Sequence, residues 1–263
     1  GKAIALNVLH AMFAIGAFLA PFIVLLCTSG SAENWRIMCF LLAGMGVVEF
    51  IIYALMPIPN DKVVKAEKAS SNGAFLREKQ FWISTGILFF YLCAEQGVIG
   101  WMVTYFKDSG LMSAGYAQVM ASILWILILI GRLTAGWLSL HMSKSRLLGL
   151  MGLGFLVFFG VIMLGRTLPL ITFGIAGFGF SMAGIYPTTV ALSGQTIKAY
   201  PLAWSTMLTV AGFGAILMPM IIGAVANTAG IYAGMLTITV AVALTLCLIL
   251  ANLLLHRGEK AAD

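Results

Sequence analysis

Charged side chains are scarce in this chain. Aspartate, glutamate, lysine and arginine together make up only 9% of the 263 residues, whereas 61% of the residues are hydrophobic. A soluble domain has about 25% charged residues and about 45 to 50% apolar residues. The composition therefore excludes a water-soluble globular protein and indicates a chain whose solvent is lipid.

Cysteine, histidine and catalytic motifs are also rare. The cysteines lie far apart with no CxxC spacing, the histidines lie in separate segments, and the sequence has no HExxH, GxSxG or P-loop pattern. The residues concerned are Cys27, Cys39, Cys93 and Cys247, and His10, His141 and His256. We interpret the cysteines as small core residues and expect no metal, no cofactor and no enzymatic activity.

Long apolar runs recur along the chain, separated by short polar breaks. A bilayer core is about 30 Å thick and is spanned by roughly 20 apolar residues in a helix. The sequence predicts an all-α membrane protein of about eight such spans, near residues 4–27, 36–57, 81–106, 116–140, 147–165, 168–195, 202–226 and 231–255.

The net charge of +6 reflects membrane orientation rather than nucleic-acid binding. If residue 1 is cytoplasmic, the cytoplasmic segments hold Lys2, Lys62, Lys65, Lys68, Arg77, Lys79, Lys144, Arg146, Lys198, Arg257 and Lys260. The other side holds only Arg36, Lys107 and Arg166. Lysine and arginine concentrate in cytoplasmic loops of membrane proteins. We therefore expect both ends of the chain to be cytoplasmic, which requires an even number of spans.

A polar linker and an internal repeat predict two helix bundles. The segment from Pro57 to Gln80 contains alternating charges and then small turn-forming residues, which is typical of a linker. The pattern GAxLxP occurs at residues 16–21 and again at 214–219, 198 residues later. Such parallel repeats are found in transporters. We predict that residues 1–57 are the last two helices of an N-terminal bundle, residues 58–80 a cytoplasmic linker, and residues 81–263 a complete six-helix C-terminal bundle. About four preceding helices of the same protein are then missing.

Three segments resemble a known family. Residues 131–138 (GRLTAGWL), which run into His141, Lys144 and Arg146, are similar to the glycine-rich basic loop motif of the major facilitator superfamily. Leu140 and Ser143 depart from that motif, which usually has aspartate and glycine there. Residues 6–13 with Gly16 and Ala17, and residues 94–97 with 184–188, resemble the fucose-permease-like sugar transporters of the superfamily.

The resemblance covers the whole chain as helices 5 to 12 of the usual twelve. It implies a secondary transporter that moves a small solute, a sugar, by alternating access. A bacterial cytoplasmic membrane is the expected location.

Glu95 is the leading candidate for a functional residue. A charged group at the centre of a membrane helix costs about 2.5 to 3.5 kcal/mol on insertion scales, so its presence needs a reason. Gln96 is adjacent, and Tyr91 lies one turn earlier on the same helical face. These groups can bond sugar hydroxyls in a water-filled cavity, and the carboxyl group can carry a proton. The alternative is a hydrogen bond between helices.

The other candidates are spread over the chain. Asn7 and His10 share one helical face that can bind hydroxyl groups, although Asn7 can equally cap the helix and His10 can bond a neighbouring helix. Tyr186, next to the helix-kinking Pro187, and Asn227 are further binding candidates. The loop motif implies a gating role for Arg132, Lys144 and Arg146. Glu49 has no charged or amide neighbour within four positions. A structural pairing with another helix is therefore an alternative to a function for Glu49.

Other functions are less well supported by the sequence. A channel would need a filter sequence or a ring of acidic residues, and neither is present. A transporter or exporter of another solute class (an organic anion, a drug or an amino acid) and a non-transporting sensor on the same fold remain open. We expect a fragment without the missing helices not to transport.

Overall fold

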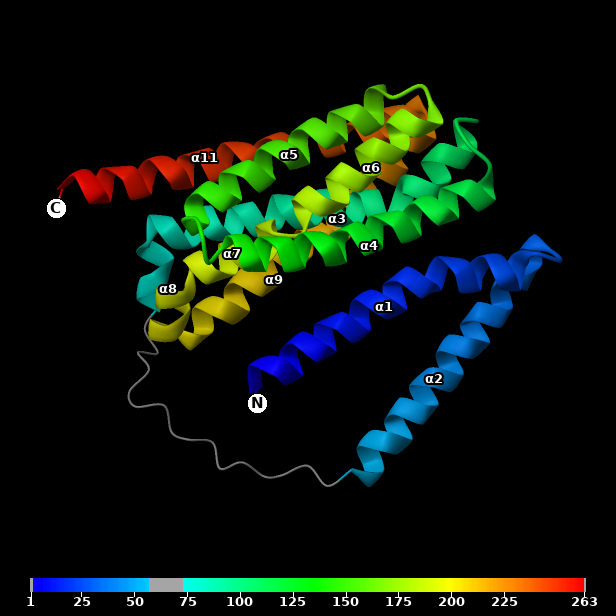
Figure 1. Ribbon diagram of the computed structural model, residues 1–263, viewed down its shortest axis with the longest axis horizontal. Coiled ribbons are helices and arrows are strands. Elements are labelled where there is room, and N and C mark those ends of the chain that lie inside the picture. Colours follow the sequence, from blue (N-terminus) through cyan, green and yellow to red (C-terminus); the bar gives the residue numbers. More distant parts are fainter. Residues whose placement is uncertain (1, 57–72, 263) are drawn as a thin grey trace.

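The computed structural model describes residues 2–56 and 73–262, and their side chains except at 2–14, 32, 201 and 256–262. Within these ranges the chain forms helices and connecting turns and no strand. The first two helices are α1 (Lys2–Thr28) and α2 (Trp35–Leu55), joined by the short helix η1 (Ala32–Asn34). Figure 1 shows them beside a larger bundle that contains the rest of the described chain.

The larger bundle begins with the short helix η2 (Gly73–Arg77). The helices that follow are α3 (Lys79–Asp108), α4 (Ala114–Leu138), α5 (Lys144–Leu164), α6 (Leu168–Met182), α7 (Ile185–Leu192), α8 (Gly194–Ala199), α9 (Pro201–Ala229), α10 (Ile231–Leu236) and α11 (Ile238–Ala262). The described residues contain seven helical segments that are long and apolar enough to cross a membrane. One of them combines α6 with α7, and another combines α10 with α11. The predicted all-α membrane fold is confirmed.

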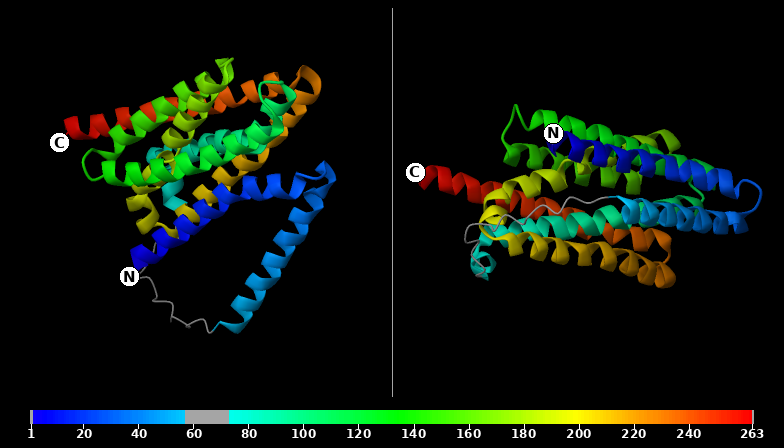
Figure 2. Two further views of the ribbon diagram at one scale, coloured as in Figure 1. Left: turned by 45° about the vertical axis from the view of Figure 1, so that its right-hand side comes forward. Right: turned by 90° about the horizontal axis from the view of Figure 1, so that it is seen from below.

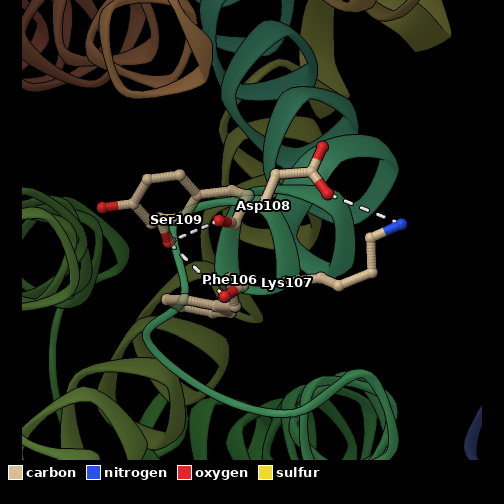
Figure 3. Close-up of polar contacts among 5 residues, drawn as sticks. Phe106, Lys107, Asp108 and Ser109 are labelled. Carbon is tan, nitrogen blue, oxygen red and sulfur yellow. Dashed lines mark hydrogen bonds and ion pairs between the residues drawn. The ribbon is translucent and has the colours of Figure 1, made fainter.

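The start of α1 and the end of α11 lie toward the same end of the molecule (Figure 1). We call this the basic end, because the turn between α4 and α5, with Lys144 and Arg146, lies there too. The other end is called the opposite end. At the opposite end α3 finishes in a polar turn, where Lys107 and Asp108 form an ion pair of 3.5 Å and the Ser109 hydroxyl donates to the Tyr105 carbonyl at 2.6 Å (Figure 3). The ion pair is exposed, so it contributes little to stability.

Close contact between α3 and α9 builds one side of the larger bundle. A Cβ atom on Gly214 would meet the carbonyl oxygen of Phe89 and would lie 2.9 Å from the sulfur of Cys93. The indole of Trp101 donates a hydrogen bond of 3.1 Å to the carbonyl of Pro219. Small residues at helix contacts allow this approach in membranes, where packing replaces the hydrophobic effect as the driving force.

The first two helices contact the larger bundle unequally. The Ser122 hydroxyl of α4 donates a hydrogen bond of 3.1 Å to the Phe18 carbonyl of α1. In contrast, no residue of α2 is buried, and Figure 2 shows α2 diverging from α1 beyond their junction. Glu49 lies on this exposed helix and forms no ion pair with any described residue.

Asn252 in α11 is a buried polar residue without a hydrogen-bond partner in the part of the chain that the structure describes. Its side chain is 1% exposed, and neither amide atom has a hydrogen-bond partner among the described residues. An unsatisfied buried polar group costs about 1 to 3 kcal/mol. We expect Asn252→Leu to raise the apparent melting temperature of the purified protein, measured by thermal unfolding in detergent.

Thr245 on the same helix provides the control for this substitution. It is equally buried, but its hydroxyl donates to the Ala241 carbonyl at 2.8 Å. Because that hydroxyl is satisfied, Thr245→Val is expected to bring no comparable gain. A lower melting temperature for Asn252→Leu would mean that the amide has a favourable partner in the folded protein.

Candidate functional site

The candidate site centres on Glu95, halfway along α3. Its carboxyl group is 8% exposed and accepts a hydrogen bond of 2.8 Å from the Tyr91 hydroxyl, one helical turn away. The neighbouring Gln96 amide also interacts with this carboxyl group. Oriented donors of this kind compensate for part of the cost of keeping a carboxylate inside a membrane protein.

Tyr91 supports Glu95 from the interior of the bundle. Its side chain is only 1% exposed, and its ring packs 6.0 Å from the Phe155 ring of α5 and 6.3 Å from the Tyr186 ring of α7. Because the ring is enclosed, the hydroxyl group is held in one direction. In this conformation Tyr91 therefore orients Glu95 and offers little surface to a solute.

Arg132 in α4 provides the positive charge of the site. Its guanidinium group is close enough to attract the Glu95 carboxylate, although the two groups form no ion pair within 4.0 Å. The side chain is partly buried, and it has no hydrogen bond or ion pair among the described residues. A half-buried guanidinium group with unused donors is suited to an anionic group.

A close helix contact fixes the start of the Arg132 side chain. A Cβ atom on the preceding residue, Gly131, would meet the backbone of Phe180 in α6 and would lie 2.8 Å from the Cβ of Ala183. The absence of a side chain at Gly131 therefore lets α4 pack directly on the end of α6. Arg132 follows this contact immediately.

A break between α6 and α7 lies next to these groups. Helix α6 ends at Met182 and α7 begins at Ile185. Pro187 has no N–H to donate to the Ala183 carbonyl, which explains the interruption. Tyr186, in the first turn after the break, lies beside Tyr91. Discontinuous helices near the bilayer midplane commonly form the solute and ion sites of transporters.

The structure brings together five of the residues that the sequence singled out and places some of the others elsewhere in the fold. Tyr91, Glu95, Gln96, Arg132 and Tyr186 come from α3, α4 and α7 around one point. The residues elsewhere are Lys144 and Arg146, both exposed at the start of α5, and Asn227, exposed near the last turn of α9 at the opposite end. The side chains of Asn7 and His10, both within α1, lie outside the described residues.

Sequence patterns did not reveal two parts of the site. Phe155 is fully buried, packs on Tyr91 and stacks on Phe178 with ring centroids 4.7 Å apart. Its sequence surroundings are those of any apolar helix. The Ala183 carbonyl is a backbone group, and only the position of Pro187, four residues later, could have indicated it.

The fold and the site together define a multi-pass helical membrane protein with a polar centre. The chain belongs to the Major Facilitator Superfamily, whose sequence profile matches residues 1–198. It therefore has the fold of a family of membrane transporters. A search of curated protein sequences finds no match.

Solved structures support the same fold. The chain is similar to a crystal structure of the superfamily transporter FucP in the outward conformation, with 17% identity, a TM-score of 0.60, and coverage of 82% of this chain and 54% of that one. It is also similar to a crystal structure of a variant of the E. coli fucose:proton symporter FucP, with 16% identity, a TM-score of 0.62, and coverage of 82% and 55%. The chain thus spans about half the length of these structures.

Proposed function

We propose that the full-length protein is a secondary active transporter that moves a small polar solute, a sugar, across the membrane by alternating access. The observation that carries this proposal is the Tyr91–Glu95 pair beside the break between α6 and α7, inside the fold of a transporter family. A carboxylate and the amide of Gln96 offer the acceptors and donors that sugar hydroxyl groups require. The fold similarity to a fucose:proton symporter supports the same substrate class.

Proton coupling is the second part of the proposal. Glu95 is the only acidic side chain near the site among the described residues. A carboxyl group that is alternately charged and protonated changes its interaction with Arg132 and with Tyr91. Binding of a proton can therefore bias the equilibrium between two conformations of the bundles. In this scheme Arg132, Lys144 and Arg146 act in gating rather than in contact with the solute.

The proposed environment follows from charge and packing. We propose that both ends of the chain are cytoplasmic in a bacterial membrane. The lysine and arginine residues favour the cytoplasmic orientation of the basic end. No residue of α2 is buried, and the matched structures are about twice as long. We expect α1 and α2 to pack against further helices of the full-length protein, and the chain without them not to transport.

One observation favours a second candidate, a transporter of organic anions. The partly buried guanidinium group of Arg132 has no hydrogen-bond or ion-pair partner among the described residues. A carboxylate on the solute is a suitable partner for it. A sugar acid combines this feature with the hydroxyl groups of the first candidate, so it is a useful test compound.

Uptake into liposomes that contain the full-length protein tests both candidates. The radiolabelled panel is fucose, glucose, galactose, gluconate and an amino acid, with an inward proton gradient and with or without a protonophore. We expect saturable uptake of one neutral sugar, with accumulation that the protonophore abolishes. Uptake of gluconate alone would select the organic-anion candidate. No uptake of any compound by correctly inserted protein would contradict the sugar proposal.

A further inference from the structure

The short helix η2 and the residue after it form a strap that packs on the basic end of the larger bundle. We define the strap as residues 73–78. Phe75 is 1% exposed although it lies in a polar connecting region. Its ring packs edge-on against Phe81 of α3 at 4.9 Å and lies 5.8 Å from the Tyr200 ring at the start of α9. The strap is therefore anchored to two helices.

Two polar contacts complete the anchorage. The Trp82 indole donates a hydrogen bond of 2.7 Å to the Leu76 carbonyl. The Thr196 hydroxyl of α8 donates one of 2.8 Å to the Glu78 carboxylate. The bond to Glu78 joins residues 118 positions apart. Hydrogen bonds to a charged group are stronger than those between neutral groups.

Helices α7 and α8 behave as one element between the strap and the candidate site. They are connected through Ser193, whose N–H donates to the Thr189 carbonyl at 3.1 Å and whose carbonyl accepts from Ile197 at 3.0 Å. At one end this element begins at the break after α6, next to Tyr186. At the other end Thr196 bonds the strap. Helix α7 also packs against α3 and α5, and the bond from Thr196 adds a contact at the end of the element away from the break.

A hydrophobic cluster reinforces this connection. Phe75 and Phe81 belong to a small buried core with Met207 of α9, and Tyr186 and Ile197 pack against the same core. Tyr186 also packs against the main core that contains Tyr91. The cluster therefore extends from the strap to the ring that lies beside the Tyr91–Glu95 pair.

We propose that the strap, through the bond between Glu78 and Thr196, positions α7 and thereby sets the location of Tyr186 at the solute site. Glu78, Thr196 and Phe75 are positioning residues in this view, because none of them lies at the site itself. The effect on solute binding rests on the proposed transport function. The positioning of α7 is a property of the fold and can be measured separately.

Hydrogen exchange of the full-length protein tests the positioning directly. Thr196→Val removes the hydroxyl donor while keeping the shape of the side chain. We expect exchange of the backbone amides of α7 and of the strap to increase about tenfold, as loss of a bond to a charged group predicts. Glu78→Ala removes the same bond from the acceptor side and is expected to act similarly, whereas Thr196→Ser retains the donor and restores protection.

Thr206 supplies a matched control. Among the described residues its hydroxyl bonds only to the Leu202 carbonyl of its own helix, at 2.9 Å, so Thr206→Val is expected to leave α7 unchanged. Unchanged exchange in α7 for both Thr196→Val and Glu78→Ala would overturn the proposal. An equal increase in all helices of the bundle would also overturn it, because that result indicates general destabilisation.

Transport kinetics connect the positioning to the solute. With the solute identified by the uptake panel, Thr196→Val is expected to raise KM about three- to tenfold and to change the maximal rate much less, in the range of measured couplings between distant positions. An unchanged KM together with increased exchange in α7 would refute the effect on the site. Absence of transport by the unmodified protein would contradict the proposed function alone, since the exchange result does not depend on it.

Discussion

Gly131→Ala is expected to destabilise the protein by about 1 to 3 kcal/mol, the range for overpacked cores. The added methyl group would meet the backbone of Phe180 and would lie 2.8 Å from the Cβ of Ala183. Backbone atoms cannot rotate away as the end of a flexible side chain can. Helices α4 and α6 must therefore separate at the point where α6 ends.

The same separation displaces the candidate site. Arg132 follows Gly131 directly, and Ala183 lies in the break that precedes Tyr186. We therefore expect Gly131→Ala to reduce solute uptake more than its loss of stability alone explains. The measurements are the apparent melting temperature in detergent and initial uptake rates corrected for the amount of inserted protein.

Gly136, on the same helix, is the matched control. A Cβ atom there has no neighbour within 4 Å. Alanine is a better helix former than glycine by about 0.8 to 1.0 kcal/mol, so Gly136→Ala is expected to leave stability unchanged or to raise it. A lower stability for Gly131→Ala together with an unchanged or higher stability for Gly136→Ala would attribute the loss to the close packing at Gly131. Equal melting temperatures for the two variants would refute the close contact between α4 and α6.

Much of the fold could be predicted from the sequence, because the thickness of a bilayer dictates the length of an apolar helix. The predicted spans 81–106 and 116–140 correspond to Lys79–Asp108 and Ala114–Leu138. The span predicted at 168–195 is interrupted after Met182. Hydropathy cannot detect such a break, because both halves are equally apolar. Pro187 was the only local signal for it.

The candidate site was predictable where it depends on one helix. The pairing of Tyr91 with Glu95 follows from their spacing of one turn. The approach of Arg132 to Glu95 could not be predicted, because it depends on how α4 packs against α3. Asn227 was selected as a polar residue in an apolar span, but it is exposed near the last turn of α9. Sequence spacing alone does not fix the depth at which such a residue lies.

The packing of the strap could not be predicted from the sequence either. Its residues follow a charged segment and read as the end of a linker. The burial of Phe75 depends on Phe81 and Tyr200, and Tyr200 lies 125 positions further along the chain. An apolar run as short as Ala74 to Leu76 carries no periodic signal. Its role became visible only through its contacts.

Glu95→Gln is expected to separate solute exchange from accumulation. Glutamine has nearly the same shape as glutamate, and its side-chain carbonyl oxygen can accept the hydrogen bond that Tyr91 donates to Glu95 at 2.8 Å. The geometry of the site is therefore retained. The amide cannot bind or release a proton, so a conformational cycle that depends on protonation of residue 95 loses its coupling.

Two liposome assays measure these properties separately. In the first, labelled solute outside exchanges for unlabelled solute inside without a proton gradient, and Glu95→Gln is expected to support this exchange. In the second, a proton gradient drives accumulation, and the variant is expected to reach only equal concentrations on the two sides. Glu33→Gln, at an exposed acidic residue in η1, is expected to behave as the unmodified protein in both assays.

The pattern of loss identifies what Glu95 does. Retained exchange with lost accumulation identifies Glu95 as the proton carrier. In that case a neutral side chain of the same shape still permits solute binding but no longer couples transport to the proton. Loss of both activities in a stably folded variant would instead mean that the solute binds the carboxylate itself. Accumulation that persists in Glu95→Gln and still collapses with a protonophore would contradict the proton-carrier role. Another carboxyl group, either Glu49 of α2 or one outside the described residues, would then have to supply the coupling.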